Sequence, residues 1–242
     1  MVGTIGTIEV IAERVAAVQV RIAAAAARSG KDPASLTLIA VTKTLDAETV
    51  RAASLAGLRE VGENKVQEAY AKRGELLDQP LLHWHLIGHL QRNKARRAAS
   101  TFDTIHSVDS LELATALNEA ASAQGRDLPV FAQVNISGES TKSGFIPRLF
   151  SQQAAALARL PALRWRGLMT IAPEGADTET LRAVFAATRR LRDAAAAVFP
   201  STTWNALSMG MTNDFEIAIE EGATHVRVGR AIFGERTETV RA

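Results

Sequence analysis

Apolar and polar positions repeat along this chain with two periods, one typical of helices and one typical of strands. The opening segment, 8–28, carries apolar residues at the helical spacing and is followed by the stop signal Ser29-Gly30. The apolar positions of this predicted helix are Ile8, Ile11, Val15, Val18 and Ile22.

Beyond residue 30, short runs with the composition of buried strands alternate with longer helical stretches. The predicted strands are 36–42, 59–63, 83–88, 104–108, 129–136, 165–171, 203–207 and 224–228. The predicted helices are 47–56, a stretch through 70–77, 111–123, 147–159, 178–198, 213–221 and a short one from 231. The helix 213–221 is predicted to begin with a capping box formed by Asn213 and Glu216.

Eight strands alternating with helices over 242 residues predict an α/β fold, a parallel (β/α)8 barrel of the TIM type with an extra helix before the first strand. An open doubly wound sheet is the alternative, but no Gly-x-Gly-x-x-Gly motif follows the first strand. No linker or low-complexity tract interrupts the pattern, so the chain is predicted to be one domain, 1–242.

The composition excludes several classes of function. Lysine plus arginine is 28 and aspartate plus glutamate is 26, and a formal charge of +2 gives no reason to expect a nucleic-acid partner. Cysteine is absent, which excludes disulfides, thiolate metal sites and a thiol nucleophile and fits a reducing compartment. The N-terminus lacks a signal-peptide pattern, and no apolar stretch reaches the ~18 residues of a spanning helix. We therefore expect a cytoplasmic protein without a membrane partner.

Lys43 lies at the end of the first predicted strand and is the first candidate for chemistry. Strand alternation places it on one face with Ile39 and Val41. An amine on such a face is costly to bury unless it pairs, deprotonates or bonds covalently. Taken alone, a lysine that ends a strand and extends into water explains the position better.

The ends of the predicted strands hold most of the lysines, although only six of the 28 basic residues are lysine. Four of the six follow a predicted strand: Lys43, Lys65, Lys94 and Lys142. Barrel enzymes place their sites at this carboxyl end of the strands. A small titratable amine is therefore repeated where a site is expected.

The loops after strands seven and eight have the features of a phosphate site. Barrels often bind phosphate there, through backbone N–H groups at the start of a short helix. Gly210 and Gly229 would let the main chain approach a phosphate closely, and Ser208 and Thr212 could add hydroxyl donors. The alternative is a pair of ordinary strand-to-helix turns with helix caps.

Arg227 is predicted to point into the barrel. In the last strand Val226 and Val228 share the face that suits the surrounding helices, which leaves Arg227 on the opposite face with His225. A buried guanidinium needs an acceptor, which could be a structural carboxylate or a heteroaromatic ring nitrogen. An inward lysine, a two-loop phosphate site and an inward arginine together match pyridoxal 5′-phosphate (PLP), which offers an aldehyde, a phosphate and a ring nitrogen.

Motifs along the whole chain carry a family resemblance. They are Ile39-Ala-Val-Thr-Lys43, Gly62-Glu-Asn-Lys-Val-Gln-Glu68, Trp84-His-Leu-Ile-Gly-His-Leu-Gln-Arg-Asn-Lys94, Asn135-Ile, Thr141-Lys-Ser-Gly144, Gly167-Leu-Met-Thr170, Leu207-Ser-Met-Gly-Met211 and Val226-Arg-Val-Gly229. In number and order they resemble the pyridoxal phosphate homeostasis proteins (the YggS-like family), which are related to the N-terminal barrel domain of alanine racemase. The resemblance implies this alanine racemase-like barrel (fold type III of PLP proteins) without a second β domain.

The resemblance also implies roles for individual residues. Lys43 would carry PLP as a Schiff base, Arg227 would face the pyridine nitrogen, and Asn64 would lie near the ring. The phosphate would be held mainly by backbone groups of Ser208, Gly210, Met211, Thr212, Gly229 and Arg230. Arg230 departs from the family, in which many members have Thr or Ser, so a hydroxyl contact is lost at this position.

The implied function is intracellular PLP (vitamin B6) homeostasis: reversible binding, buffering and delivery to PLP-dependent apoenzymes, with no catalytic residue. The alternative is a PLP-dependent amino-acid racemase. An arginine at the ring nitrogen makes the ring a weaker electron sink, and a racemase needs a second acid/base group opposite the cofactor. In alanine racemases that group is a tyrosine supplied across a dimer with a second domain. Here the one tyrosine, Tyr70, lies on a predicted helix and the chain ends 14 residues after Val228, so we expect a monomeric carrier.

Lys142 is a candidate second amine for cofactor transfer. It lies in a Ser/Gly-rich loop at the same face of the predicted barrel as Lys43. A solvated loop lysine is the simpler explanation.

A metal-dependent barrel hydrolase is a distant alternative, suggested by His83, His85 and His89. Alternation places His83 and His85 on one face, at a spacing suited to metal ligands. However, this pair opens the third strand and lies toward the wrong end of the barrel for a site, as does His225, and no clustered carboxylates accompany them. No metal is expected.

Overall fold

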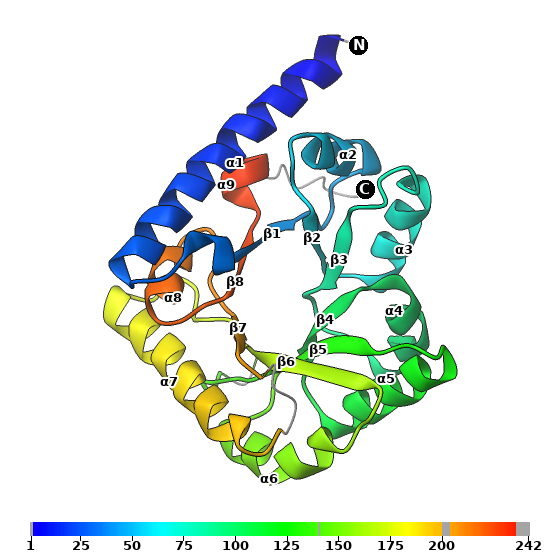
Figure 1. The fold of residues 1–242 in the computed structure, drawn as a ribbon, viewed down its shortest axis with the longest axis vertical. Coiled ribbons are helices and arrows are strands. Elements are labelled where there is room, and N and C mark those ends of the chain that lie inside the picture. Colours follow the sequence, from blue (N-terminus) through cyan, green and yellow to red (C-terminus); the bar gives the residue numbers. More distant parts are fainter. Residues whose placement is uncertain (1, 140, 200–203, 236–242) are drawn as a thin grey trace.

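Eight parallel strands close into a barrel in the computed structural model, which describes residues 2–139, 141–199 and 204–235 (Figure 1). Their order around the ring follows the sequence from β1 to β8. The strands are β1 (Thr37–Val41), β2 (Glu60–Glu63), β3 (His83–Leu86), β4 (Thr104–Val108), β5 (Leu128–Gln133), β6 (Leu163–Met169), β7 (Ala206–Ser208) and β8 (His225–Val228). The predicted parallel barrel is confirmed.

Helices surround the ring of strands (Figure 1). They are α1 (Val2–Arg28), α2 (Ala47–Leu55), α3 (Val66–Glu75), α4 (Ala95–Thr101), α5 (Leu111–Ala123), α6 (Pro147–Ala158), α7 (Thr178–Ala196), α8 (Phe215–Glu220) and α9 (Arg230–Phe233). Two short 3-10 helices, η1 (Pro33–Ser35) and η2 (Arg92–Lys94), join them. Within the described ranges, every helix is too short or too polar to cross a membrane.

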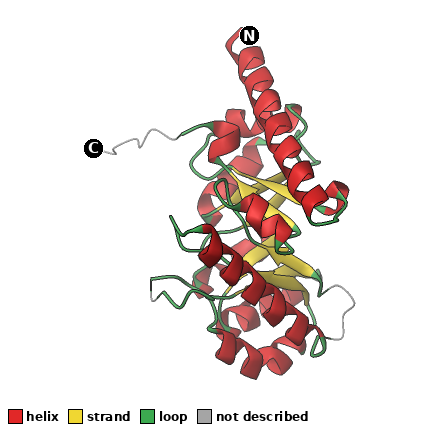
Figure 2. Cartoon of the chain, turned by 90° about the vertical axis from the view of Figure 1, so that its left-hand side faces the viewer, coloured by secondary structure: helices red, strands yellow, loops and turns green. Residues whose placement is uncertain are grey.

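The extra N-terminal helix α1 is confirmed, and it packs along α2, α8 and α9 at the side of the barrel. Its first turns project beyond the body of the molecule (Figure 2). The predicted stripe is buried at Ile11, Val15, Val18 and Ile22. Arg21 ties the helix to α8, because its guanidinium lies 2.9 Å from the Glu216 carboxylate and 4.5 Å from the centre of the Phe215 ring.

The main hydrophobic core lies between the strands and the helices. Outward-facing strand residues such as Val61 and Val226 belong to one continuous cluster of buried side chains there. A smaller apolar cluster of Phe131, Met169 and Ala206 stands apart from it. Buried polar side chains occupy much of the rest of the barrel interior, and Arg227 and Ser208 among them lie next to the candidate site.

Three details of the local prediction differ from the structure. The sequence pattern does not predict α4, because its buried side chains are alanines, which give a weak periodic signal. The predicted capping box is wrong: the N-cap of α8 is Asp214, and Glu216 pairs with Arg21 instead. The strand predicted at 203–207 is found at Ala206–Ser208, and residue 203 lies outside the described residues.

Candidate functional site

Lys43 follows the inward-facing side of β1. Ile39 lies in register with Arg227 of β8, and Val41 lies in register with Gly62 of β2, so these four positions share one face of the sheet. The strand ends at Val41, and Lys43 lies half-buried in the turn that follows. The candidate lysine is therefore at the carboxyl end of the barrel, where barrel enzymes place their sites.

A buried ion pair fixes the residue before Lys43. The Lys72 ammonium of α3 lies 2.7 Å from a carboxylate oxygen of Glu63, and both side chains are buried. The Thr42 hydroxyl donates to the same carboxylate oxygen at 2.7 Å, and the Thr42 carbonyl accepts from Lys72 at 2.9 Å. Burial raises the pKa of Glu63, although the Lys72 charge acts against this shift. The pair thus holds the main chain that leads into Lys43.

Arg227 is buried in the barrel, as predicted. One terminal nitrogen donates to the Ser208 hydroxyl oxygen and the other to the Thr170 carbonyl oxygen, each at 2.8 Å. Both acceptors are neutral oxygens, so no carboxylate of the described residues lies within hydrogen-bonding distance of the guanidinium. Burial lowers the pKa of Arg227 to about 10, against the attraction of Asp214, and the group stays charged at neutral pH.

The loop between β7 and α8 depends on Gly210. Its φ is 94°, a backbone conformation that favours glycine. A Cβ at this position would lie 2.6 Å from the Ala218 Cβ and 2.8 Å from the Phe215 Cα. The Gly210 carbonyl accepts the Arg227 backbone N–H at 2.9 Å. The loop after β7 is therefore packed tightly against the first turn of α8 and tied to β8.

Several backbone N–H groups lack a protein acceptor in the loop after β7, which contains Gly210, and in the loop after β8, which contains Gly229. We call these two segments the glycine loops. Among the described residues, none accepts from the amides of Gly210, Thr212 and Gly229. The Met211 amide is different, because it donates to the Asp214 carboxylate. Asp214 is buried, and burial raises its pKa although the Met211 amide opposes the shift. The unpaired amides are suited to an anion with several oxygen acceptors.

Ser208 and Arg230 were also predicted to bind the phosphate, but their side chains do not belong to the loops. The Ser208 hydroxyl is fully buried between Arg227 and His106 inside the barrel, instead of serving the loop. Arg230 is exposed and is the first residue of α9. Its backbone, rather than its side chain, belongs to the loop after β8.

Neighbouring strands bring the predicted site residues together. β7, β8, β1 and β2 are consecutive around the closed ring (Figure 1). Lys43 follows β1, Asn64 follows β2, and the two glycine loops follow β7 and β8. One side of the carboxyl face therefore gathers an amine, an amide side chain, a buried guanidinium and a set of unpaired N–H groups.

A cavity of about 260 Å³ adjoins this group through Asn64. His89 and Lys142 also line it. The Lys142 ammonium lies 2.6 Å from a carboxylate oxygen of Glu139 and donates to the Ala172 carbonyl at 3.2 Å. Lys142 is thus at the same face as Lys43, as predicted, but it follows β5, which is adjacent to neither β7, β8, β1 nor β2 in the ring.

A chain of hydrogen bonds crosses the inside of the barrel below the candidate site. The Ser208 Oγ lies 2.8 Å from His106 Nδ1, and His106 Nε2 lies 2.8 Å from His85 Nδ1. His85 Nε2 lies 2.6 Å from a carboxylate oxygen of Glu60. With Arg227 at its upper end, the chain takes one residue from each of β8, β7, β4, β3 and β2. It connects the carboxyl end of the barrel to the amino end, where Glu60 begins β2.

Donor and acceptor rules assign the direction of this chain. Burial lowers the pKa of His85 and lowers that of His106 well below its usual range, so both rings are neutral at neutral pH. Burial acts to raise the pKa of Glu60, but its bond to His85 and the neighbouring histidines lower that pKa overall, which leaves the carboxylate ionised. We therefore assign a proton to His85 Nε2 and to His106 Nε2, and Ser208 donates to His106 Nδ1. Every donor points from the arginine toward the carboxylate.

His225 adds a partly buried imidazole to the amino half of the barrel. Its ring centre lies 5.2 Å from that of Phe131, which stacks on His106 at 4.3 Å. Burial, and then the neighbouring His85, lower the pKa of His225 to about 3. His225 is thus neutral in the folded chain at pH values where the unfolded chain, with an ordinary histidine pKa near 6.5, is partly protonated.

We expect His225 to make folding stability fall on acidification. Between the unfolded pKa near 6.5 and the folded pKa of about 3, the unfolded chain binds more protons, so lowering the pH favours unfolding by up to about 1.4 kcal/mol per pH unit. Urea unfolding of wild type and His225→Asn between pH 6 and pH 4 should give a shallower loss of stability in the variant. The matched control is His89→Asn, which removes a histidine from an exposed position. Parallel curves for wild type and His225→Asn would contradict the expectation.

Sequence reasoning missed Glu60 and His106 as functional candidates. The expectation that no carboxylate accompanies His83 and His85 is incorrect, because Glu60 is the register partner of His83 and bonds to His85. Register between neighbouring strands is the signal that could have found it, since residues that open adjacent barrel strands lie side by side. His106 alternates with Ile105 in β4, so its inward direction was readable, but its partners lie across the ring.

Comparison with known proteins identifies relatives over almost the whole chain. The alanine racemase N-terminal domain family matches residues 14–237. The pyridoxal phosphate homeostasis protein of Pseudomonas aeruginosa is 47% identical, and the alignment covers 93% of this chain and 96% of the relative. That of Escherichia coli is 44% identical, with 93% of this chain and 97% of the relative covered.

A solved structure gives the same result. PipY of Synechococcus elongatus, with PLP bound, superposes with a TM-score of 0.82 at 42% identity. The match covers 93% of this chain and 100% of PipY. The barrel described above is therefore the fold of a protein that has been observed to bind PLP.

Proposed function

We propose that this chain, which belongs to the pyridoxal phosphate homeostasis proteins, binds PLP reversibly at the carboxyl end of its barrel and supplies it to other proteins. The barrel is that of the alanine racemase N-terminal domain. The observation that carries the proposal is the convergence of four neighbouring strands. They place Lys43, Asn64, the buried Arg227 and the unpaired loop amides on one side of one face.

Lys43 is the residue that would hold the cofactor covalently. PLP supplies an aldehyde, whose carbon forms a C=N bond to a lysine amine with loss of one water. The amine of Lys43 suits this role because the preceding residue, Thr42, is held by the buried pair of Glu63 and Lys72. A main chain fixed at this point limits the positions that the amine can take.

Arg227 would face the ring nitrogen. Its guanidinium is buried, charged and bonded only to neutral oxygens of Ser208 and Thr170, so it keeps a net positive charge toward the site. A permanent cation disfavours a proton on a nearby pyridine nitrogen. The ring is then a poor electron sink, which suits storage of the cofactor better than chemistry on amino acids.

The phosphate would be held by the loops after β7 and β8. The amides of Gly210, Thr212 and Gly229 are the donors that the described residues leave unpaired, and the backbone of Arg230 continues this group into α9. Ser208 and Met211 belong to the same segment. Their hydroxyl and amide are engaged by Arg227 and Asp214, so their contribution is to hold the loop in place.

A carrier role without catalytic turnover is supported by the position of Tyr70. It is the one tyrosine of the chain, and it lies exposed on α3 with its ring 5.1 Å from the Arg97 guanidinium. A racemase needs an acid/base group on each face of the cofactor. The racemase alternative predicts that the PLP-loaded protein exchanges the α-hydrogen of amino acids in D₂O, whereas a carrier leaves it in place.

Lys142 would be a second amine that accepts the cofactor on its way out. Its place on the cavity that Asn64 also lines supports this assignment, while its pairing with Glu139 opposes it. Borohydride reduction of PLP-treated Lys43→Ala, followed by peptide mapping, should find the cofactor on Lys142. Absence of label there would remove Lys142 from the proposal and leave Lys43 untouched.

The direct test of PLP binding is the visible absorption of the loaded protein. Wild type saturated with PLP should be yellow after removal of free cofactor, Lys43→Ala should lose most of this absorption, and Lys43→Ala/Lys142→Ala should lose it completely. The matched control is Lys65→Ala, because Lys65 follows the neighbouring strand β2 but is exposed and paired with Glu68. Undiminished colour in Lys43→Ala, colour that persists in Lys43→Ala/Lys142→Ala, or loss of colour in Lys65→Ala would refute the assignment.

A further inference from the structure

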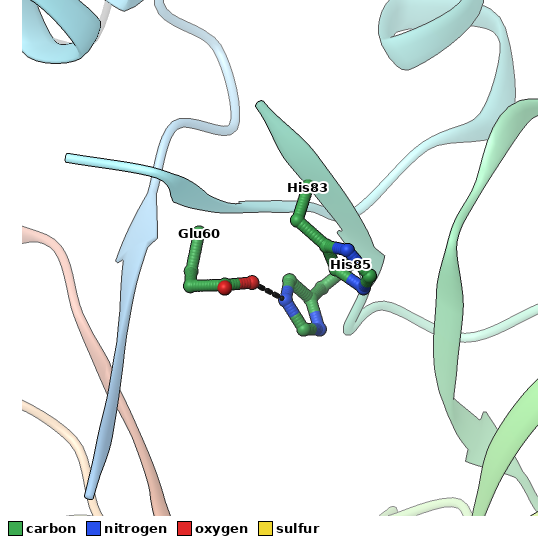
Figure 3. Close-up of side chains that lie close together, drawn as sticks. All are labelled: Glu60, His83 and His85. Atoms are coloured by element: carbon green, nitrogen blue, oxygen red, sulfur yellow. Dashed lines mark hydrogen bonds and ion pairs between the residues drawn. The ribbon is translucent and has the colours of Figure 1, made fainter. Parts of the chain in front are cut away.

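Three side chains that commonly bind metal ions meet at the amino end of the barrel, opposite the candidate PLP site. Glu60 begins β2, and His83 and His85 lie on β3. Their possible ligand atoms all lie within 4.8 Å of one another (Figure 3). The Glu60 side chain is 33% exposed and His83 is half-buried, so an ion could enter from solvent.

Each histidine of this group is also held by a partner on a second ring nitrogen. His83 Nε2 lies 3.0 Å from the Thr104 hydroxyl, and His85 Nδ1 lies 2.8 Å from His106. Histidines that bind metals almost always donate their other ring N–H to such a partner, which fixes the ring and its tautomer. This second contact separates the group from a chance meeting of a carboxylate with two imidazoles.

We propose that Glu60, His83 and His85 bind a divalent transition-metal ion, represented by Zn²⁺. The ligand atoms would be a Glu60 carboxylate oxygen, His83 Nδ1 and His85 Nε2, with water in the fourth position. Two imidazoles and one carboxylate are a ligand set that Zn²⁺ accepts. Magnesium and calcium prefer oxygen ligands and are not expected to compete.

Binding requires only small side-chain movements. Tetrahedral ligands around Zn²⁺ lie about 3.4 Å apart when each bond is about 2.1 Å. The direct 2.6 Å bond between Glu60 and His85 must therefore open, and the wider separations, all within 4.8 Å, must close. Glu60 is the partly exposed member and can supply most of this movement. The ion is not a hydrolytic centre on this account, because barrel active sites lie at the other end.

The hydrogen-bond chain from His85 through His106 and Ser208 connects such an ion to Arg227. The effect of the ion on the cofactor site rests on the proposed function. With metal on His85 Nε2, the ring proton must lie on Nδ1, so His85 becomes the donor to His106 Nε2. The proton of His106 then lies on Nδ1 and points at the Ser208 oxygen. Three protons are present before and after, but each link between His85 and Ser208 has reversed. Ser208 now accepts from both His106 and Arg227, which changes the surroundings of the guanidinium at the cofactor site.

The test of the site uses cofactor-free protein, so it does not depend on PLP. Titration calorimetry with ZnCl₂ should show one ion per wild-type chain, and Co²⁺ should give a visible absorption that Zn²⁺ displaces. His83→Gln and Glu60→Gln should weaken binding by more than about tenfold, and Thr104→Val by about tenfold, because it removes the outer partner of His83. The control is His89→Gln, which removes a histidine that pairs with a carboxylate, Asp109, elsewhere on the barrel.

Several results would overturn the proposal. They are no Zn²⁺ binding to wild type, equal binding by wild type and both ligand variants, or loss of binding in His89→Gln. Circular dichroism identifies any variant that fails to fold. Glu60→Gln keeps the size of the side chain and an acceptor for His85, so this variant is expected to fold and to decide the test if His83→Gln does not fold.

The connection to the cofactor site has its own readout. In PLP-loaded protein, Zn²⁺ should shift the visible absorption of wild type but not that of His106→Phe, in which the chain is interrupted next to the stacked Phe131 ring. A shift of equal size in both proteins would refute the connection while leaving the metal site intact. If PLP does not bind at all, the proposed function fails and the titration of cofactor-free protein still decides the metal site.

Discussion

Replacing Lys72 with methionine should lower the free energy of unfolding by about 3–5 kcal/mol, because it leaves the buried Glu63 carboxylate without its cation. Burial already raises the pKa of Glu63 against the pull of Lys72, and none of the residues that the structure describes forms a hydrogen bond with its second carboxylate oxygen. Urea unfolding of cofactor-free wild type and Lys72→Met at pH 7.5 measures the loss. A change below about 1 kcal/mol would show that the pair does not anchor this part of the barrel.

The double variant Glu63→Gln/Lys72→Met is the control for this prediction. It removes both charges, so it should regain more than half of the stability that Lys72→Met loses. The stability of Lys72→Met relative to wild type should also rise as the pH falls, because the folded variant, with the higher Glu63 pKa, then binds the extra proton. A double variant as unstable as the sum of the two single variants would contradict the explanation by an unpaired charge.

Gly167→Ala should be the most damaging single substitution in the barrel, with a loss of more than about 4 kcal/mol. Gly167 lies at a bulge in β6, where the register with β5 passes from Trp165 opposite Val130 to Gly167 opposite Phe131. Its φ is 153°, and a Cβ there would lie 1.8 Å from the Ala206 carbonyl oxygen of β7. Backbone atoms of two paired strands cannot move apart without breaking the ring, so the clash cannot be relieved locally.

Gly74→Ala is the matched control. Gly74 lies near the end of α3 with no atom within 4 Å of the position of a Cβ, and it is exposed. Alanine there should raise stability by about 0.5–1 kcal/mol, because it restricts the unfolded chain and favours the helix. Thermal unfolding of both variants compares them directly. A Gly167→Ala protein that folds with near wild-type stability would mean that the close approach of β6 and β7 is not required.

The barrel could be predicted from the local sequence because each strand repeats the same alternation of outward-facing and inward-facing residues. Val226 and Val228 belong to the outer cluster of buried side chains and Arg227 lies inside, as alternation requires. Where local signals are weak the prediction failed: α4 buries alanines, and the start of α8 depends on Asp214, whose carboxylate bonds to the Met211 amide across the turn. Alanine and turn contacts leave little periodic trace in a sequence.

The polar interior could not be predicted, because it depends on contacts across the ring. His106 and Ser208 are 102 positions apart in sequence and meet only because β4 and β7 face each other inside the barrel. The pairing of Thr42 with Glu63 and Lys72 likewise joins β1, β2 and α3. The positions of lysine and arginine in the sequence thus indicated the cofactor, whereas the residues that hold these side chains could be identified only from the structure.

Covalent attachment of PLP to Lys43 is the central claim, and hydride reduction followed by mass spectrometry tests it most directly. Reduction turns a labile C=N bond into a stable C–N bond, so the attached lysine keeps the cofactor through digestion. Wild type saturated with PLP should carry one reduced cofactor, on the peptide that contains Lys43, and Lys43→Ala should carry none at that position. A saturated and reduced wild-type protein without cofactor mass on Lys43 would contradict the account.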